Sequence, residues 1–111
     1  MVIVFEERKF EKQCNNQSKL IQAQGALRAK KLRLRLDDLK AALTLEDMRN
    51  APGRCHELHG NLVDHLSLDL DHPYRLLFVP DHDPIPRKDD GGLDWNQVTA
   101  VKIVGIRDTH D

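Results

Sequence analysis

The fold is decided by the stretch His65-Leu66-Ser67-Leu68-Asp69-Leu70-Asp71-His72-Pro73-Tyr74-Arg75-Leu76-Leu77-Phe78-Val79. Its first part alternates polar residues with leucines that face one way, which predicts a half-buried β-strand. Asp71-His72-Pro73 has the composition of a tight turn, and the segment from Tyr74 to Val79 predicts an antiparallel return strand. We therefore expect a β-hairpin here.

Further strands are predicted on both sides of this hairpin. The segment from Arg54 to Leu58 alternates and predicts a strand before it. A loop rich in proline and aspartate runs from Pro80 to Asn96, and the segment from Val98 to Ile106 then predicts a closing strand. The apolar run from Val2 to Phe5 predicts one more short strand at the N-terminus.

Between the first strand and the sheet the apolar residues follow a helical period. Glu6 to Asn15 predicts a short helix, and Ser18 is a suitable N-cap for a long helix that ends at about Ala42. Two apolar stripes run along the long helix: Ile21, Leu32, Leu36, Leu39 and Leu43 form one, and Leu20, Leu27 and Leu34 form the other. Two stripes predict two neighbours. The first is the sheet; the second is the short helix, which we favour, or a separate protein chain.

This order of elements predicts an α+β protein, in which an N-terminal strand and two helices, one short and one long, pack on a C-terminal, mainly antiparallel sheet. The 111 residues are enough for one domain, so we expect a single domain over residues 1–111. The apolar N-terminal run ends at Glu6 and is too short for a signal sequence or a membrane span. We therefore predict a cytoplasmic protein with no membrane partner.

Charge is distributed unevenly along the chain, although the formal net charge is only −1. Residues 1–49 contain 11 Lys/Arg and 7 Asp/Glu, whereas residues 50–111 contain 6 and 11 and also all six histidines. A polyanion can bind a local basic surface, but the overall field gives it little long-range steering. Cys14 and Cys55 lack the spacing of a redox or zinc motif, and we predict buried thiols.

Arg75 interrupts a strand that is otherwise apolar on both faces. A buried guanidinium needs an anionic partner. The sequence leaves two interpretations open. Arg75 forms either a structural ion pair, with Asp69 as a close candidate across the hairpin, or a clamp for a phosphodiester, which suits the planar fork of arginine donors.

His56 lies on the first strand of the sheet and His110 just beyond the last, so we expect the two to meet at one edge or end of the sheet. Two imidazoles can act on RNA as base and acid without a metal: one removes the 2′-hydroxyl proton and the other protonates the 5′-oxygen. His56 and His59 are spaced as in a metal motif, but residues three apart on a strand point to opposite faces. We predict no metal site.

Several segments together resemble one family. They are Gly53-Arg54-Cys55-His56-Glu57-Leu58-His59-Gly60-Asn61, the strands Leu66–Leu70 and Tyr74–Phe78, and the basic helix Arg28–Leu36. They resemble the RelE/ParE superfamily of toxins from type II toxin-antitoxin systems, specifically its HigB-like plasmid-maintenance killer branch. The closing Asp108-Thr109-His110 is similar to the C-terminal Asp-Tyr-His of that branch. The likeness covers nearly the whole chain.

The resemblance implies an mRNA endonuclease that needs no metal or small-molecule cofactor, acts on the ribosome and inhibits translation. It also implies neutralisation by a cognate HigA-like antitoxin with a helix-turn-helix domain. His56, Arg75, Asp108 and His110 match the family's catalytic positions. In these roles the two histidines are general acid and base in an order left open, Arg75 stabilises the phosphorane charge, and Asp108 orients a histidine.

The resemblance also assigns RNA contacts to Arg54, His59 and Thr109. The family usually has a lysine where this chain has His59 and a tyrosine where it has Thr109, so a permanent cation and a stacking ring are missing. Two alternatives therefore stay open: a catalytically weakened or inactive protein that still binds an antitoxin, and a gyrase-directed toxin that cuts no RNA. The stripe of Leu20, Leu27 and Leu34 is the candidate antitoxin surface.

Overall fold

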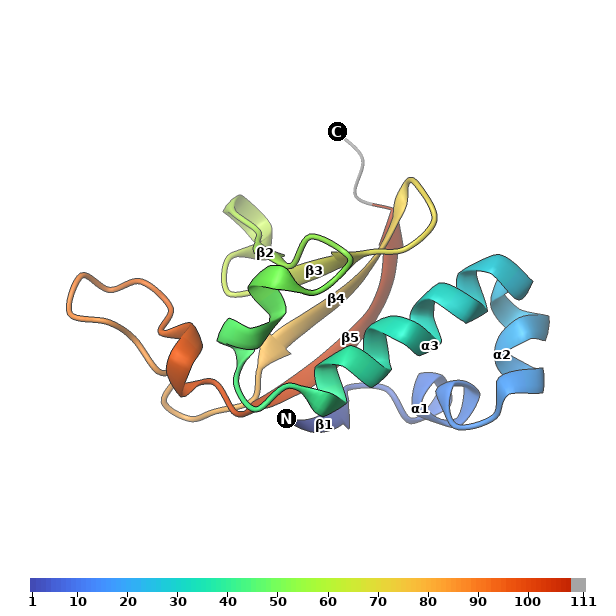
Figure 1. Cartoon of the computed structure of the whole chain (residues 1–111), viewed down its shortest axis with the longest axis horizontal. Helices are drawn as coiled ribbons and strands as arrows, with labels where there is room; N and C mark the ends of the chain where they lie inside the picture. The colour runs from blue at the N-terminus through green and yellow to red at the C-terminus, as the bar shows by residue number, and fades with distance from the viewer. Residues whose placement is uncertain (109–111) are drawn as a thin grey trace.

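The computed structural model describes residues 1–108. Figure 1 shows its elements, which are β1 (Val2–Phe5), α1 (Arg8–Cys14), α2 (Gln17–Gln24), α3 (Ala26–Ala41), β2 (His56–Glu57), β3 (Leu66–Asp69), β4 (Tyr74–Pro80) and β5 (Ala100–Asp108), with 3-10 turns η1 (Leu45–Asn50), η2 (Gly60–Leu62) and η3 (Trp95–Gln97). Helices precede most of the strands, and the predicted α+β class is confirmed.

The sheet has five strands in the order β1-β5-β4-β3-β2. β1 runs parallel to β5, and every other neighbouring pair is antiparallel. β3 and β4 form the predicted hairpin, in which Asp69 lies opposite Arg75. β2 is shorter than the predicted strand from Arg54 to Leu58, and at its start Arg54 has a φ of 51°, a left-handed conformation that cannot continue a ladder.

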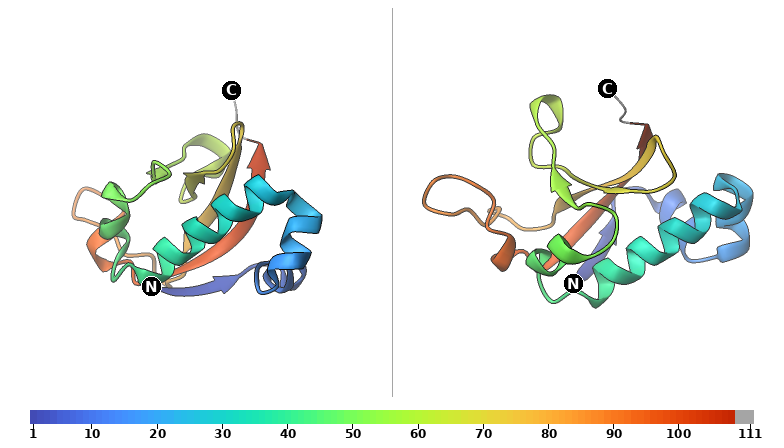
Figure 2. Two further views of the ribbon diagram at one scale, coloured as in Figure 1. Left: turned by 45° about the vertical axis from the view of Figure 1, so that its right-hand side comes forward. Right: turned by 45° about the horizontal axis from the view of Figure 1, so that its top comes forward.

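The prediction of one uninterrupted helix from Ser18 to Ala42 is wrong. Gly25 separates α2 from α3, and Figure 2 shows the sharp bend between them. The Gly25 N–H donates to the Ile21 carbonyl at 2.8 Å and closes α2, while its carbonyl accepts from the Ala29 N–H at 3.0 Å and opens α3. One residue thus ends one helix and begins the next.

Gly25→Ala is expected to lower the free energy of unfolding by about 1–3 kcal/mol, because Gly25 has φ 83° and ψ 158°, a region that only glycine occupies without strain. The space around a new Cβ is open, so the loss comes from the backbone alone. Urea denaturation measures it. The exposed helical change Gln22→Ala is the control, and equal stability of the two variants would contradict the prediction.

α3 lies across one face of the sheet (Figures 1 and 2). Leu32, Leu36 and Leu39 of α3 are buried in the main core cluster, as the first apolar stripe predicted. Ile21 and Leu43 of the same stripe are 42% and 81% exposed and do not belong to this core. Within residues 1–108, no helix combines the length and the apolar character that crossing a membrane requires.

Both cysteines are free thiols, Cys14 buried and Cys55 half-buried. Burial raises the pKa of Cys14 to about 11 and that of Cys55 to about 12. A raised pKa keeps each group protonated at neutral pH, and the thiol form is a poor nucleophile. We expect iodoacetamide to leave the folded protein unmodified under conditions that alkylate both cysteines of the unfolded chain, as read by mass spectrometry. Rapid alkylation of either thiol in the folded protein would contradict this.

Candidate functional site

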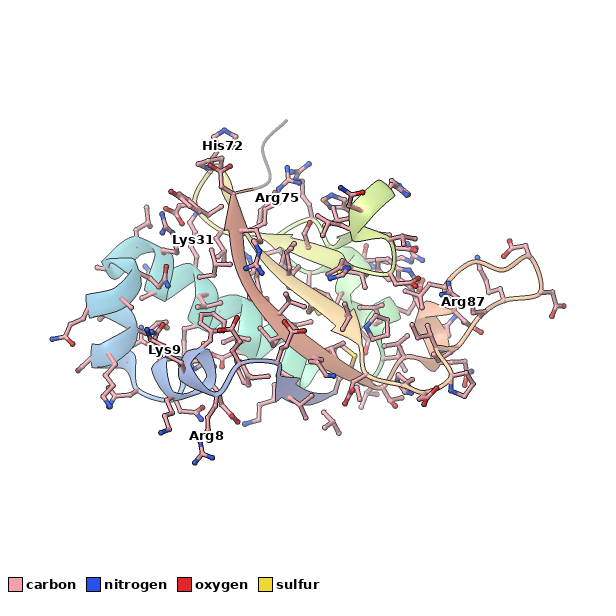
Figure 3. All side chains as sticks on the ribbon, turned by 180° about the vertical axis from the view of Figure 1, so that it is seen from behind. Arg8, Lys9, Lys31, His72, Arg75 and Arg87 are labelled. Carbon is pink, nitrogen blue, oxygen red and sulfur yellow. The ribbon has the colours of Figure 1, made fainter. Side chains whose placement is uncertain are left out.

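The basic side chains of Arg54, His72 and Arg75 lie close together at one end of the sheet, where the β3–β4 hairpin turns. Figure 3 shows Arg75 and His72 at this end of the molecule, well away from Arg8. A small pocket of about 70 Å³ opens there, lined by Arg54, Asp69, Leu70, His72, Pro73, Tyr74 and Arg75. Two arginines and one histidine therefore line a pocket beside a single carboxylate.

Asp69 is paired with both arginines of this pocket. Its Oδ2 accepts a hydrogen bond from the Arg54 Nε at 2.5 Å, and its Oδ1 lies 3.4 Å from the Arg75 Nε. The hydrogen bond to Asp69 raises the pKa of Arg54 further above its usual value. The Arg75 side chain is only 23% exposed, and the ion pair with Asp69 that the sequence offered as one interpretation is present.

The backbone of Asp69 is fixed as well. Its N–H donates to the Gly53 carbonyl at 2.8 Å, and its carbonyl accepts from the Arg35 Nε at 2.8 Å. Gly53 has a φ of 104°, and a Cβ there would lie 2.7 Å from the Arg35 Nε. Glycine is therefore required where Arg35 passes, and it places Arg54 directly beside Asp69.

Arg28 of α3 supports the turn of the same hairpin. Its Nε and Nη2 donate to the two carboxylate oxygens of Asp71 at 2.9 and 3.1 Å, and its guanidinium lies 3.6 Å from the centre of the Tyr74 ring. The hydrogen bonds from Arg28 lower the pKa of Asp71. Sequence reasoning missed these contacts of Arg28 and Arg35, which join α3 to the hairpin and leave no periodic signal.

His56 lies on β2 opposite Ser67 of β3. Its Nδ1 is 2.7 Å from the Arg54 carbonyl oxygen, and because a carbonyl only accepts, Nδ1 carries the hydrogen. In the neutral ring the Nε2 is then an acceptor. Since alternate residues of a strand share a face, the register places His56 on the same sheet face as Asp69 and Arg75, opposite the face that buries Leu66.

The C-terminal strand ends at the same place. Asp108 is the last residue of β5 and lies opposite Tyr74, next to the pair Arg75 and Arg107. The register therefore brings Asp108 to the hairpin end of the sheet, but because it pairs with Tyr74 its side chain is on the face opposite that of Arg75 and His56. Thr109 and His110 lie outside the described residues, so the expected meeting of His56 with His110 stays a prediction.

The remaining predicted residues lie away from the pocket. His59 is exposed and precedes the η2 turn, beyond the end of β2. Leu20 is completely buried in the core, so its assignment to an antitoxin surface is wrong, whereas Leu27 and Leu34 are 60% and 49% exposed. Among residues 1–108, no group of three His, Cys, Asp or Glu side chains is placed to hold a metal ion.

No model of a protein family matches the sequence, and no curated protein matches it. Solved structures do match. A YoeB/ParE toxin from Agrobacterium tumefaciens has a TM-score of 0.61 at 11% identity, over 99% of this chain and 100% of that chain. The YoeB dimer from Staphylococcus aureus has a TM-score of 0.55 at 20% identity, over 100% of this chain and 98% of that chain.

The YoeB-YefM complex from Staphylococcus aureus is also similar, with a TM-score of 0.57 at 18% identity over 99% of this chain and 98% of that chain. Each of these three solved structures matches this chain over nearly its whole length, although the sequence identity is low. With its helices packed on a five-stranded sheet, the chain has the fold of RelE/YoeB-type toxins.

Proposed function

We propose that this chain is the toxin of a type II toxin-antitoxin pair, of the HigB-like branch, and that it is a metal-independent endonuclease acting on mRNA at the ribosome. The observation that carries the proposal is that His56 of β2 and Arg75 of β4 lie on the same face of the sheet, with β3 between them, in a chain that has a toxin fold. An acid-base group and a cation beside it are what phosphodiester cleavage requires. Asp108, the last residue of β5, lies at the hairpin end of the same sheet.

In the proposed reaction the 2′-hydroxyl attacks the adjacent phosphorus, the bond to the 5′-oxygen breaks, and a cyclic phosphate forms. The protonation of Nδ1 leaves the His56 Nε2 able to accept the hydroxyl proton. His110 then protonates the leaving oxygen, or the two histidines exchange roles. Arg75 stabilises the negative charge on the phosphorane, Asp108 orients a histidine, and Arg54, His59 and Thr109 contact the RNA.

Induction of the chain in cells, followed by mapping of mRNA ends, tests this function. We expect discrete new 5′ ends within translated regions, and their loss when the product of a neighbouring helix-turn-helix gene is co-expressed. Arg75→Ala is the matched control and is expected to produce far fewer ends. Growth arrest without new mRNA ends, accompanied by changes in DNA supercoiling, would instead identify a gyrase-directed toxin.

One observation favours a second candidate, an antitoxin-binding protein with little or no catalysis. Asp69 pairs with both Arg54 and Arg75, so the pocket has less positive charge than its arginines alone would give. Loss of the family tyrosine at Thr109 points the same way. This candidate predicts tight binding of the antitoxin and no mRNA cleavage in the free protein.

We propose that the antitoxin contacts the exposed leucines of α3. Leu27→Asp is expected to weaken co-purification with the antitoxin by about tenfold or more, because a charge replaces apolar contact area at the interface. Leu43→Asp is the control, since Leu43 is more exposed and lies beyond the end of α3. Equal binding of the Leu27 variant and the parent protein would reject this surface.

A further inference from the structure

Asp69 joins two guanidinium groups that reach it from separate segments of the chain. Arg54 comes from the residues before β2, and Arg75 comes from β4. Both contacts are made through the Nε atom of the arginine. This differs from Arg28, which uses both Nε and Nη2 on Asp71. Within residues 1–108, the terminal Nη groups of Arg54 and Arg75 therefore donate no hydrogen bond to Asp69 and can donate to a ligand.

One oxygen of the carboxylate lies deeper in the protein than the Arg54 side chain. The Asp69 Oδ1 is buried and has no hydrogen-bond partner among the described residues, whereas the Arg54 side chain is 70% exposed. A carboxylate that competed for an incoming anion would occupy the solvent-facing side of the guanidinium groups. The Oδ1 of Asp69 is on the protein side of Arg54, while the Asp69 side chain as a whole is 28% exposed, close to the 23% of Arg75.

Asp69 is also a fixed point. Its backbone is bound on both sides, by the Gly53 carbonyl and by the Arg35 side chain, and it lies at the end of β3. Arg54 is long and exposed, and without such an anchor its side chain would lose much conformational freedom on binding a ligand. A fixed carboxylate removes part of that entropic cost in advance.

We propose that Asp69 is a positioning residue, which holds Arg54 and Arg75 as a two-arginine fork for one phosphodiester group at the hairpin pocket. The fork keeps one net positive charge, because one carboxylate offsets one of two guanidinium groups. The identification of this phosphodiester as part of an RNA rests on the proposed function. The binding of an anion by the fork does not rest on it. The catalytic assignments above give no role to Asp69 and do not include its contact with both Arg54 and Arg75.

The sign of one measurement separates positioning from competition. Asp69→Asn makes the pocket more positive, and electrostatics alone would then increase the affinity for a polyanion. If Asp69 instead positions the arginines, the same change lowers the affinity despite the more favourable charge. The two interpretations therefore predict opposite shifts for one substitution.

The experiment uses the full chain and a short, fluorescent single-stranded RNA with 2′-O-methyl groups, which cannot be cut by 2′-hydroxyl attack. Fluorescence anisotropy gives the Kd. Asp69→Asn is expected to weaken binding by about tenfold, the order of loss expected when one hydrogen bond between a guanidinium group and the anion is lost. Asp71→Asn changes the charge equally in the same hairpin, but its partner is Arg28, so it is expected to bind as well as the parent or better. Equal or tighter binding by Asp69→Asn would overturn the proposal.

A second variant does not depend on the folding of Asp69→Asn. Arg54 is mostly exposed, so Arg54→Gln is expected to fold normally and to weaken binding of the same RNA. Asp69→Asn should then weaken binding less in the Arg54→Gln background than in the parent, because part of its effect passes through Arg54. Unchanged binding by Arg54→Gln, or fully additive effects, would overturn the fork.

Cleavage of an unmodified RNA by the same proteins distinguishes failure of the fork from failure of the proposed function. If Asp69→Asn weakens binding but no protein cleaves, the fork stands and the nuclease function falls. If the parent cleaves and Asp69→Asn binds and cleaves equally well, the function stands and the fork falls.

Discussion

His56→Ala is expected to lower the rate of mRNA cleavage by about 10² to 10⁴, the range that general acid-base groups contribute. The imidazole lies on the face of the sheet that carries Arg75, and its Nδ1 bonds the Arg54 carbonyl at 2.7 Å. Alanine removes the Nε2 acceptor without disturbing a buried side chain, since His56 is half-buried. Single-turnover cleavage of a ribosome-bound mRNA measures the rate.

His65→Ala is the matched control for this prediction. The His65 Nδ1 lies 3.3 Å from the Val63 carbonyl, again two residues earlier in the chain, and His65 lies just before β3 in the segment that follows β2. Its loss is expected to leave the rate near that of the parent. Equal cleavage by the His56 and His65 variants would show that His56 takes no part in the chemistry.

Phe78→Ala is expected to lower the free energy of unfolding by about 3–5 kcal/mol. Phe78 is completely buried on β4, where it lies opposite Leu66 of β3 and Ile103 of β5. Removing the ring leaves a cavity between three strands whose positions are fixed by backbone hydrogen bonds, so the core cannot collapse fully around it. Guanidinium denaturation monitored by circular dichroism measures the loss.

Leu27→Ala is the control for the core substitution, because Leu27 is 60% exposed. Its effect is expected to stay within about 0.5 kcal/mol, as for most surface changes. A loss below about 1 kcal/mol in the Phe78 variant would mean that the sheet repacks around alanine. The packing of β3, β4 and β5 would then be looser than the structure indicates.

The hairpin was predictable from the sequence because both of its signals are local. Alternation marks β3, and the residues of a turn follow it directly. The division between α2 and α3 was not predictable, because apolar residues continue at helical spacing on both sides of Gly25. A glycine inside a helix lowers the stability of the helix by only about 1 kcal/mol. Whether such a glycine bends the chain depends on the packing of α2 with its neighbours.

The candidate site was predictable only in part, for a similar reason. Asp69 and Arg75 are neighbours across a hairpin, so the register shows their pairing. The contacts of Arg35 and Arg28 with the hairpin join residues 34 and 43 positions apart, and periodicity contains nothing about such separations. The roles of His110 and Thr109 stay predictions.

The position of β5 determines when the sheet can be completed during synthesis. β5 is the last element among residues 1–108, yet it lies inside the sheet, between β1 and β4. β1 therefore has no parallel partner until the residues of β5 have been synthesised. A nascent chain has an open sheet and lacks Asp108 until that moment, so a cell making this protein meets the finished sheet only after residue 108 has been synthesised.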